Sequence, residues 1–64
     1  MKVGTIVCPR WFVPGYPVGL TMDTRCVVRE VRKRDKRVRV ERDDGRQGSY
    51  WLDFEAVRIF GRVS

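Results

Sequence analysis

The sequence has no histidine and only two cysteines, Cys8 and Cys26, among 64 residues. Without histidine the chain lacks the side chain whose charge changes most readily near neutral pH, which is also the commonest metal ligand. Two cysteines fall short of the four ligands of a structural zinc site. The sequence also lacks a glycine-rich phosphate loop placed before a helix. We therefore expect no metal and no cofactor.

Long apolar runs are absent as well. No stretch approaches the ~18 apolar residues that a membrane-spanning helix needs, and residues 1–4 lead into a short, polar-interrupted run rather than a secretory signal. We therefore expect an intracellular, cytoplasmic protein with reduced thiols and no membrane partner. Cys8 and Cys26 both lie in apolar segments, which favours a place in the core, and a disulfide between them is left open.

The length of the chain predicts a single domain, residues 1–64. A domain this small buries only about 60% of its unfolded surface, so its stability is marginal unless something adds to it. A partner subunit is one usual source of added stability. A homodimer is therefore one hypothesis that the sequence raises.

Alternating valines predict the centre of the fold. Val38 and Val40 alternate with charged neighbours at a period of two, which is typical of a strand buried on one face. Asp43-Asp44-Gly45 predicts a hairpin turn, because glycine tolerates the positive φ of such turns. The chain then predicts, in order, an aromatic-rich strand at 49–52, one helical turn at 53–56 and a last strand at 57–60.

The first half of the chain predicts two more strands. Residues 2–8 form the first, which Pro9 stops, and residues 24–32 form the second. Between them, residues 10–20 mix proline and glycine with aromatic residues, and we expect a long irregular loop.

The second of these strands changes its parity along its length. A bulge near Arg29 would turn both Val28 and Val31 inward, and small barrels need bulges to turn corners. The strongly charged residues 33–36 then predict the tip of a hairpin.

Taken together, these segments predict an all-β fold, and their order resembles a five-stranded SH3-like barrel with one short helical turn before the last strand. The valine-rich hairpin 26–40, Asp43-Asp44-Gly45 and Tyr50-Trp51-Leu52 resemble the Tudor-like and KOW-like members of the SH3-like superfamily. Type II dihydrofolate reductase is an enzyme built from such barrels, with a Val-Gln-Ile-Tyr motif in its fourth strand. The corresponding residues here, 50–53, lack that motif, so the resemblance does not imply this activity.

Charge is the strongest compositional signal. Fourteen Lys and Arg residues face eight Asp and Glu residues, giving a net charge of +6 and a pI near 10.2. Eleven of the fourteen are arginine, whose planar fork binds phosphate bidentately and stacks on aromatic rings. Arg37 and Arg39 share a face, where crowded like charges would destabilise a sheet unless an anion binds there. Alternatively, Glu30 and Glu41 neutralise these arginines by cross-strand pairing.

The seven aromatic residues are the second signal. If Tyr50 points inward, Trp51 points outward, because neighbours on a strand alternate. By the same rule, Val57 and Ile59 inward would place Phe60 outward. The residues of the loop could cover Trp51, or the outward rings could serve as a stacking platform for bases, a subunit interface or an aromatic cage for a cation.

The expected function is a non-enzymatic nucleic-acid-binding module that uses an Arg-rich hairpin and exposed aromatic rings, with DNA and RNA both left open. Catalysis is not expected, since the adjacent Asp43 and Asp44 of a turn are normally solvated. The alternative is a protein–protein interaction module, such as a phage or mobile-element adaptor or inhibitor that binds an acidic host protein. The predicted nucleic-acid contacts are Arg29, Arg32, Lys33, Arg34, Lys36, Arg37, Arg39, Arg42, Arg46 and Trp51.

Overall fold

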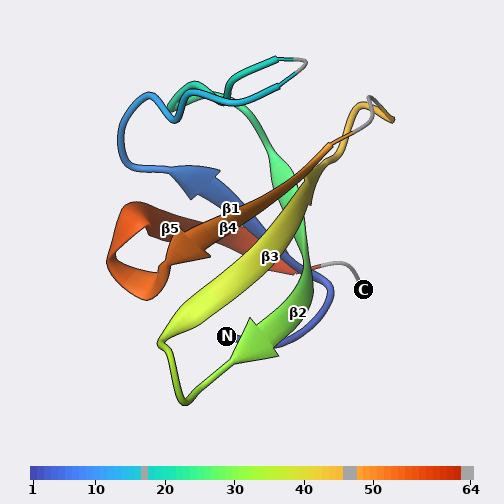
Figure 1. Ribbon diagram of the computed structural model, residues 1–64. Helices are drawn as coiled ribbons and strands as arrows, with labels where there is room; N and C mark the ends of the chain where they lie inside the picture. The colour runs from blue at the N-terminus through green and yellow to red at the C-terminus, as the bar shows by residue number, and fades with distance from the viewer. Residues whose placement is uncertain (17, 46–47, 63–64) are drawn as a thin grey trace.

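The computed structural model describes residues 1–16, 18–45 and 48–62. Along the chain lie β1 (Thr5–Pro9), β2 (Cys26–Arg32), β3 (Arg37–Arg42), β4 (Ser49–Asp53), the single 3-10 turn η1 (Phe54–Ala56) and β5 (Val57–Arg62). The strands form one antiparallel sheet in the order β4-β3-β2-β1-β5, which curls into a half-barrel (Figure 1). The predicted all-β fold, with five strands and a helical turn before the last, is confirmed. Within these ranges no helix has the length and apolar character to cross a bilayer.

The concave side of the sheet holds the core. Val28, Val38 and Val40 are fully buried there, and Tyr50 and Leu52 point to the same side from β4, as their alternation predicts. Leu20 of the long loop is also fully buried and belongs to the same cluster. Removing these apolar side chains from water is the main force that holds the sheet in its curled form.

A bulge in β2 sets which side chains reach the outer face. The register with β3 passes from Val28 opposite Val40 to Glu30 opposite Arg39, so Arg29 is the extra residue. The side chain of Val31 returns to the core side, as predicted. Because one residue is inserted, the neighbours Arg29 and Glu30 both remain outside the core, where a regular strand would have separated them.

The first strand differs from its prediction at both ends. It begins at Thr5 rather than at residue 2, because Gly4 takes a φ of +93° and its N–H donates to the carbonyl of Val28 at 2.8 Å. Pro9 is the last residue of β1 and lies opposite Val57. Proline has no N–H to donate to the ladder, and it is tolerated at the end of a strand because the ladder stops there.

One predicted core residue lies at the surface. Val57 is buried as expected, but Ile59 is 61% exposed, although it lies opposite the buried Val7. The prediction for Ile59 is therefore wrong. Alternation assigns a side of the sheet, but β5 is the last strand in the sheet order and has no next strand that could cover the residue.

The long loop between β1 and β2 is fixed by contacts far away in sequence. Val13 and Leu20 exchange two backbone hydrogen bonds of 2.8 and 2.7 Å, which closes the loop as a narrow bend. The hydroxyl of Tyr50 donates to the carbonyl of Val18. A Cβ atom on Gly15 would lie 2.4 Å from the Tyr50 ring, so this close approach needs glycine.

The turn between β2 and β3, residues 33–36, contains a strained lysine. Lys36 has a φ of +54°, a region that costs an L-residue about 1–2 kcal/mol. The conformation is held by the Lys36 carbonyl, which accepts a hydrogen bond of 2.9 Å from the N–H of Phe54.

Replacing Lys36 by glycine is expected to stabilise the protein by about 0.5–1 kcal/mol. Glycine adopts this φ without strain, and its larger unfolded-state entropy offsets only part of the gain. Thermal unfolding should show a midpoint about 2–8 °C higher. Lys36→Ala is the matched control, because it removes the charge and keeps the strained φ. An equal gain from both variants would trace the effect to charge instead of backbone strain.

Candidate functional site

Three cross-strand rows of side chains cover the outer face of β2, β3 and β4. Each row has one residue from each strand, and directly opposite residues lie close enough to interact. Two rows follow the register directly: Glu30, Arg39 and Trp51; and Arg32, Arg37 and Asp53. In the third, Glu41 lies opposite Ser49, and Arg29, the bulge residue of β2, reaches Glu41 with its side chain although Val27 is the residue opposite Glu41 in the register.

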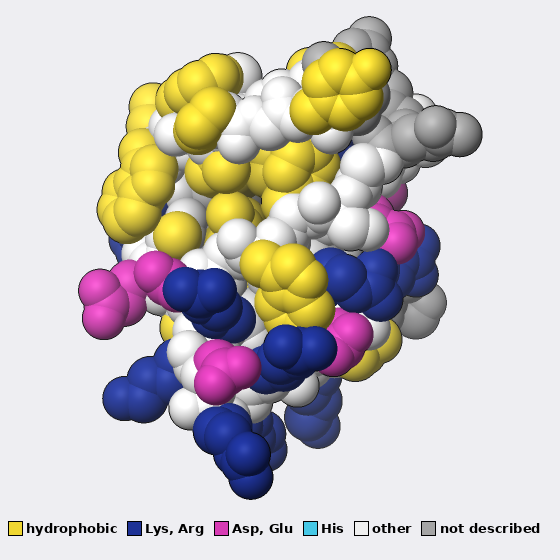
Figure 2. Space-filling view, in the orientation of Figure 1, with side chains coloured by type: hydrophobic (Ala, Val, Ile, Leu, Met, Phe, Trp, Pro, Cys, Tyr) yellow, Lys and Arg dark blue, Asp and Glu magenta, His cyan; other side chains and the backbone are white. Residues whose placement is uncertain are grey.

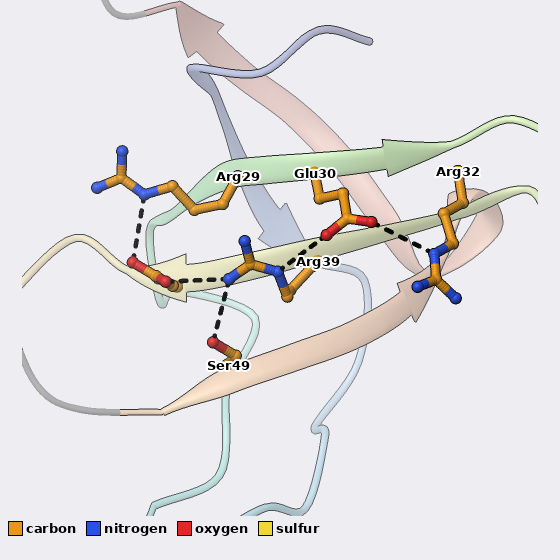
Figure 3. Close-up of polar contacts among 6 residues, drawn as sticks. Arg29, Glu30, Arg32, Arg39 and Ser49 are labelled. Atoms are coloured by element: carbon orange, nitrogen blue, oxygen red, sulfur yellow. Dashed lines mark hydrogen bonds and ion pairs between the residues drawn. The ribbon is translucent and has the colours of Figure 1, made fainter.

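Carboxylates bridge the arginines of these rows (Figure 3). Glu41 accepts from Arg29 at 3.2 Å and from Arg39 at 3.1 Å. Glu30 in turn joins Arg39 at 3.5 Å to Arg32 at 3.3 Å. Cross-strand pairing by Glu30 and Glu41, the alternative that the sequence left open, is present for Arg39 and Arg29, whereas Arg37 pairs with Asp53.

These ion pairs lower the charge that the outer face presents without removing its arginines from use. Arg37 pairs with Asp53 at 3.1 Å, so four arginines face three carboxylates across the rows. Solvent-exposed pairs contribute only about 0.2–1 kcal/mol each, and a phosphate could replace a carboxylate at small cost. The rows alone are therefore a weak anion site, and they do not explain the net charge of +6.

Arg42 contributes to the fold instead of to an open surface. Its guanidinium donates to the carbonyl of Gly19 at 3.0 Å and to the Asp44 carboxylate at 2.9 Å, and its side chain is only 13% exposed. The hydrogen bonds to Asp44 raise the pKa of Arg42 above its usual value. Arg42 therefore joins the long loop to the β3–β4 connection.

The β2–β3 turn carries the cations that the rows lack. Lys33, Arg34 and Lys36 are exposed and, within the ranges that the structure describes, form no ion pair of 4.0 Å or less. Asp35 is the single carboxylate within the turn. Figure 2 shows Lys and Arg gathered at the end of the molecule where this turn lies. Arg46, another predicted contact, falls outside the described residues.

Trp51 lies outward as predicted, and it is in contact with a cation. The Arg32 guanidinium carbon is 4.4 Å from the centroid of a Trp51 ring, which is cation–π geometry. The indole remains 39% exposed, so the long loop does not cover it.

A groove separates Trp51 from the long loop. Its volume is about 270 Å³, and hydrophobic side chains surround a hollow on this face in Figure 2. Trp11 and Phe12 line it from the loop and are 53% and 62% exposed, whereas Tyr16, at 93% exposure, lies outside it. We call this the aromatic groove; it is lined by Trp11, Phe12, Val13, Pro14, Arg37, Trp51, Leu52, Asp53 and Ala56.

The aromatic groove and the β2–β3 turn form one continuous surface. Arg37 lines the groove and directly follows Lys36 of the turn. Arg32 stacks on Trp51 and directly precedes Lys33. The two residues that flank the turn therefore contact the groove or its Trp51 ring, and the cations Lys33, Arg34 and Lys36 extend from the turn between them.

Sequence reasoning missed Trp11 and Phe12 as site residues. It treated them as a cover for Trp51, and the structure shows them forming the opposite wall of a groove. The signal was two adjacent aromatic residues in a loop rich in proline and glycine. Binding residues are often found on loops, so aromatic residues in such a loop are candidates for a binding surface.

A larger hollow of about 430 Å³ opens beside the β3–β4 connection. Its two lining cations, Arg29 and Arg42, already form ion pairs with Glu41 and Asp44, and its other charged lining residue, Asp43, is acidic. We therefore place the candidate site at the aromatic groove. No group of three or more acidic, cysteine or histidine residues in the described part of the chain could hold a metal ion.

Comparison with protein-family models, with curated proteins and with solved structures gives no significant match to this chain. The fold and the site define a small all-β domain with an aromatic groove beside a basic turn. Its function is argued from that geometry.

Proposed function

We propose that this chain binds single-stranded nucleic acid, with bases in the aromatic groove and phosphates on the β2–β3 turn. The supporting observation is the continuity of the two features through Arg32 and Arg37. Proteins that bind single strands combine a cationic track for the backbone with aromatic rings on which bases stack. The net charge of +6 favours an anionic partner in general.

The geometry favours a single strand over a duplex. In a duplex the base faces are stacked on their neighbours, and a base enters a protein groove only after it is flipped out at a cost of a few kcal/mol. A duplex would instead need a broad cationic surface for its phosphates, and the outer rows offer only four arginines against three carboxylates. An unpaired base can stack on the rings of the groove directly.

The strained residue at the turn supports the same proposal. Lys36 occupies a φ that glycine would adopt without strain, so lysine at this position makes the folded protein less stable than glycine would. Strained residues of this kind gather at binding sites, where the side chain has a use that outweighs the strain. A phosphate contact by Lys36 would be such a use.

The test is binding of fluorescein-labelled oligo(dT) and oligo(U), about 12 nucleotides long, measured by anisotropy over a range of salt. Trp51→Ala and Trp11→Ala should each weaken binding by about 5- to 150-fold, equivalent to 1–3 kcal/mol for one stacked base, with little change in salt dependence. The triple variant Lys33→Gln, Arg34→Gln, Lys36→Gln should reduce the slope of log affinity against log salt by about 2, because each phosphate contact on a single strand contributes roughly 0.7.

Two matched controls separate this site from other surfaces. Tyr16→Ala removes an exposed ring outside the groove, and Arg39→Gln removes a cation held by Glu30 and Glu41; each should leave affinity within about twofold. Equal affinity for duplex and single strand, or unchanged binding in the groove and turn variants, would contradict the proposal. Absence of nucleic-acid binding at low salt, together with tight binding to an acidic protein, would establish a protein-interaction module.

A further inference from the structure

A second exposed surface lies at the opposite edge of the sheet, on β5. Phe60 is about half exposed, and the Arg25 guanidinium carbon lies 4.4 Å from its ring centroid. Arg25 directly precedes β2, and β1 lies between β2 and β5 in the sheet, so this contact joins segments whose strands are not neighbours. Arg58 and Ile59 are exposed on the same strand. We call these four residues, Arg25, Arg58, Ile59 and Phe60, the β5 patch.

The charge of this surface differs from that of the outer rows. Neither β1 nor β5 contains an acidic residue. Arg25 and Arg58 form no ion pair of 4.0 Å or less with any described residue, whereas Arg29, Arg32, Arg37 and Arg39 are all paired. Glu30, Glu41 and Asp53 thus balance the β2–β4 face. Asp23, Asp43 and Asp44 line a hollow together with Arg25, but Arg25 forms no ion pair of 4.0 Å or less with any of them, and no carboxylate of β1 or β5 balances Arg58.

The backbone of β5 offers a template for another strand. The strand hydrogen-bonds to β1 on one side, and it is the last strand of the sheet on the other. An edge of this kind can accept an extended peptide through main-chain hydrogen bonds, while alternate side chains of that peptide meet the surface.

We propose that the β5 patch binds an acidic, extended peptide segment of a protein partner, which adds to β5 as a sixth strand. Arg58 and Ile59 are neighbours on β5, so their side chains leave opposite faces of the strand. Carboxylates on one face of the added segment would pair with Arg25 and Arg58, and the apolar side chains that alternate with them would pack on Ile59 on the other face. The charge complementarity and the free edge together select this occupant. The site is distinct from the aromatic groove and does not rest on the nucleic-acid proposal.

Two other occupants fit the patch less well. A second copy of this chain would bring the same patch against itself in a two-fold dimer, so that Arg25 and Arg58 would face arginines. A nucleic-acid base would find one face of Phe60 already covered by Arg25, and Ile59 has no ring on which to stack.

The test uses a fluorescein-labelled peptide of about eight residues in which aspartate and valine alternate, at low salt, with a lysine–valine peptide of equal length as control. The acidic peptide should bind the intact chain, and the control should bind at least about tenfold more weakly. The double variant Arg25→Gln, Arg58→Gln should lose about tenfold in affinity for the acidic peptide, as expected for two solvent-exposed ion pairs. Amide hydrogen exchange should slow in β5 when the peptide is bound, and Trp51→Ala should bind the peptide normally.

Each contrary outcome overturns this proposal. Equal binding of the two peptides would show that charge has no role, and no binding at millimolar peptide would show that the edge is closed. Slowed exchange in β4 instead of β5 would place the peptide at the wrong edge. Competition by oligo(dT), with loss of oligo(dT) binding in the double variant, would make the patch a nucleic-acid surface. The groove variants report on the nucleic-acid proposal separately.

Discussion

Truncation of Leu20 to alanine is expected to remove about 2–5 kcal/mol of stability, the usual cost of removing a fully buried leucine side chain. Leu20 has no exposed surface and packs in the core, although it belongs to the long loop. A protein of 64 residues has about 3–10 kcal/mol in total, so this single truncation should remove a large part of its stability. Urea unfolding followed by tryptophan fluorescence measures the loss directly.

Met22→Ala is the matched control for this prediction. Met22 lies two residues further along the same loop and is 55% exposed, so its truncation should change stability by no more than about 0.5 kcal/mol. If both variants lost the same small amount, the loop would not be anchored in the core. The Leu20→Ala variant should also bind oligonucleotides poorly at temperatures where it remains folded, because Leu20 holds the loop that carries Trp11 and Phe12.

Stability is expected to fall steeply between pH 9 and pH 11 because of one thiol. Cys26 is fully buried and, like Cys8, is not in a disulfide. Burial, with a smaller effect of the neighbouring Cys8 thiol, raises the pKa of Cys26 from 9.0 to about 11. Above pH 9 the unfolded chain loses this proton while the folded chain keeps it, so the folded state binds more protons and stability decreases as pH rises.

The size of this effect follows from the separation of the two pKa values. Each pH unit between them lowers the free energy of unfolding by about 1.4 kcal/mol, so the loss from this group approaches about 2–3 kcal/mol at pH 11. Urea midpoints of the wild type and of Cys26→Ala, compared at several pH values, measure it. Parallel pH curves for the two proteins would show that Cys26 does not carry the effect.

The parts of the fold that were predicted correctly depend on local alternation. Tyr50, Trp51 and Leu52 take the sides that a period of two requires, and the parity change in β2 located the bulge at Arg29. Alternation gives the side of the sheet but not what lies against that side. Ile59 shows the limit. The local pattern defines which side of β5 it takes, but it is exposed because β5 is the last strand of the sheet and no further strand covers it.

The site was less predictable because it depends on register and on the path of an irregular loop. The pairing of Arg39 with Glu30 and Glu41 follows from a register that the bulge shifts by one residue. The place of Trp11 depends on loop contacts such as the one from Tyr50 to Val18, 32 residues apart. The strain at Lys36 has no local signal, since lysine is not a residue type that predicts a positive φ.

The pairing of β1 with β5 determines how the domain responds to tension. Thr5, at the start of β1, lies opposite Arg62, at the end of β5. A force that pulls these two residues apart acts across an antiparallel ladder from its open end, so it loads the paired residues one after another. Strands pulled along their length in opposite directions would share the load among all their hydrogen bonds at once. When the domain is stretched between Thr5 and Arg62, we therefore expect the β1–β5 hydrogen bonds to break in sequence from that end. β5 would separate from β1 first, and Val57 would then be pulled out of the core.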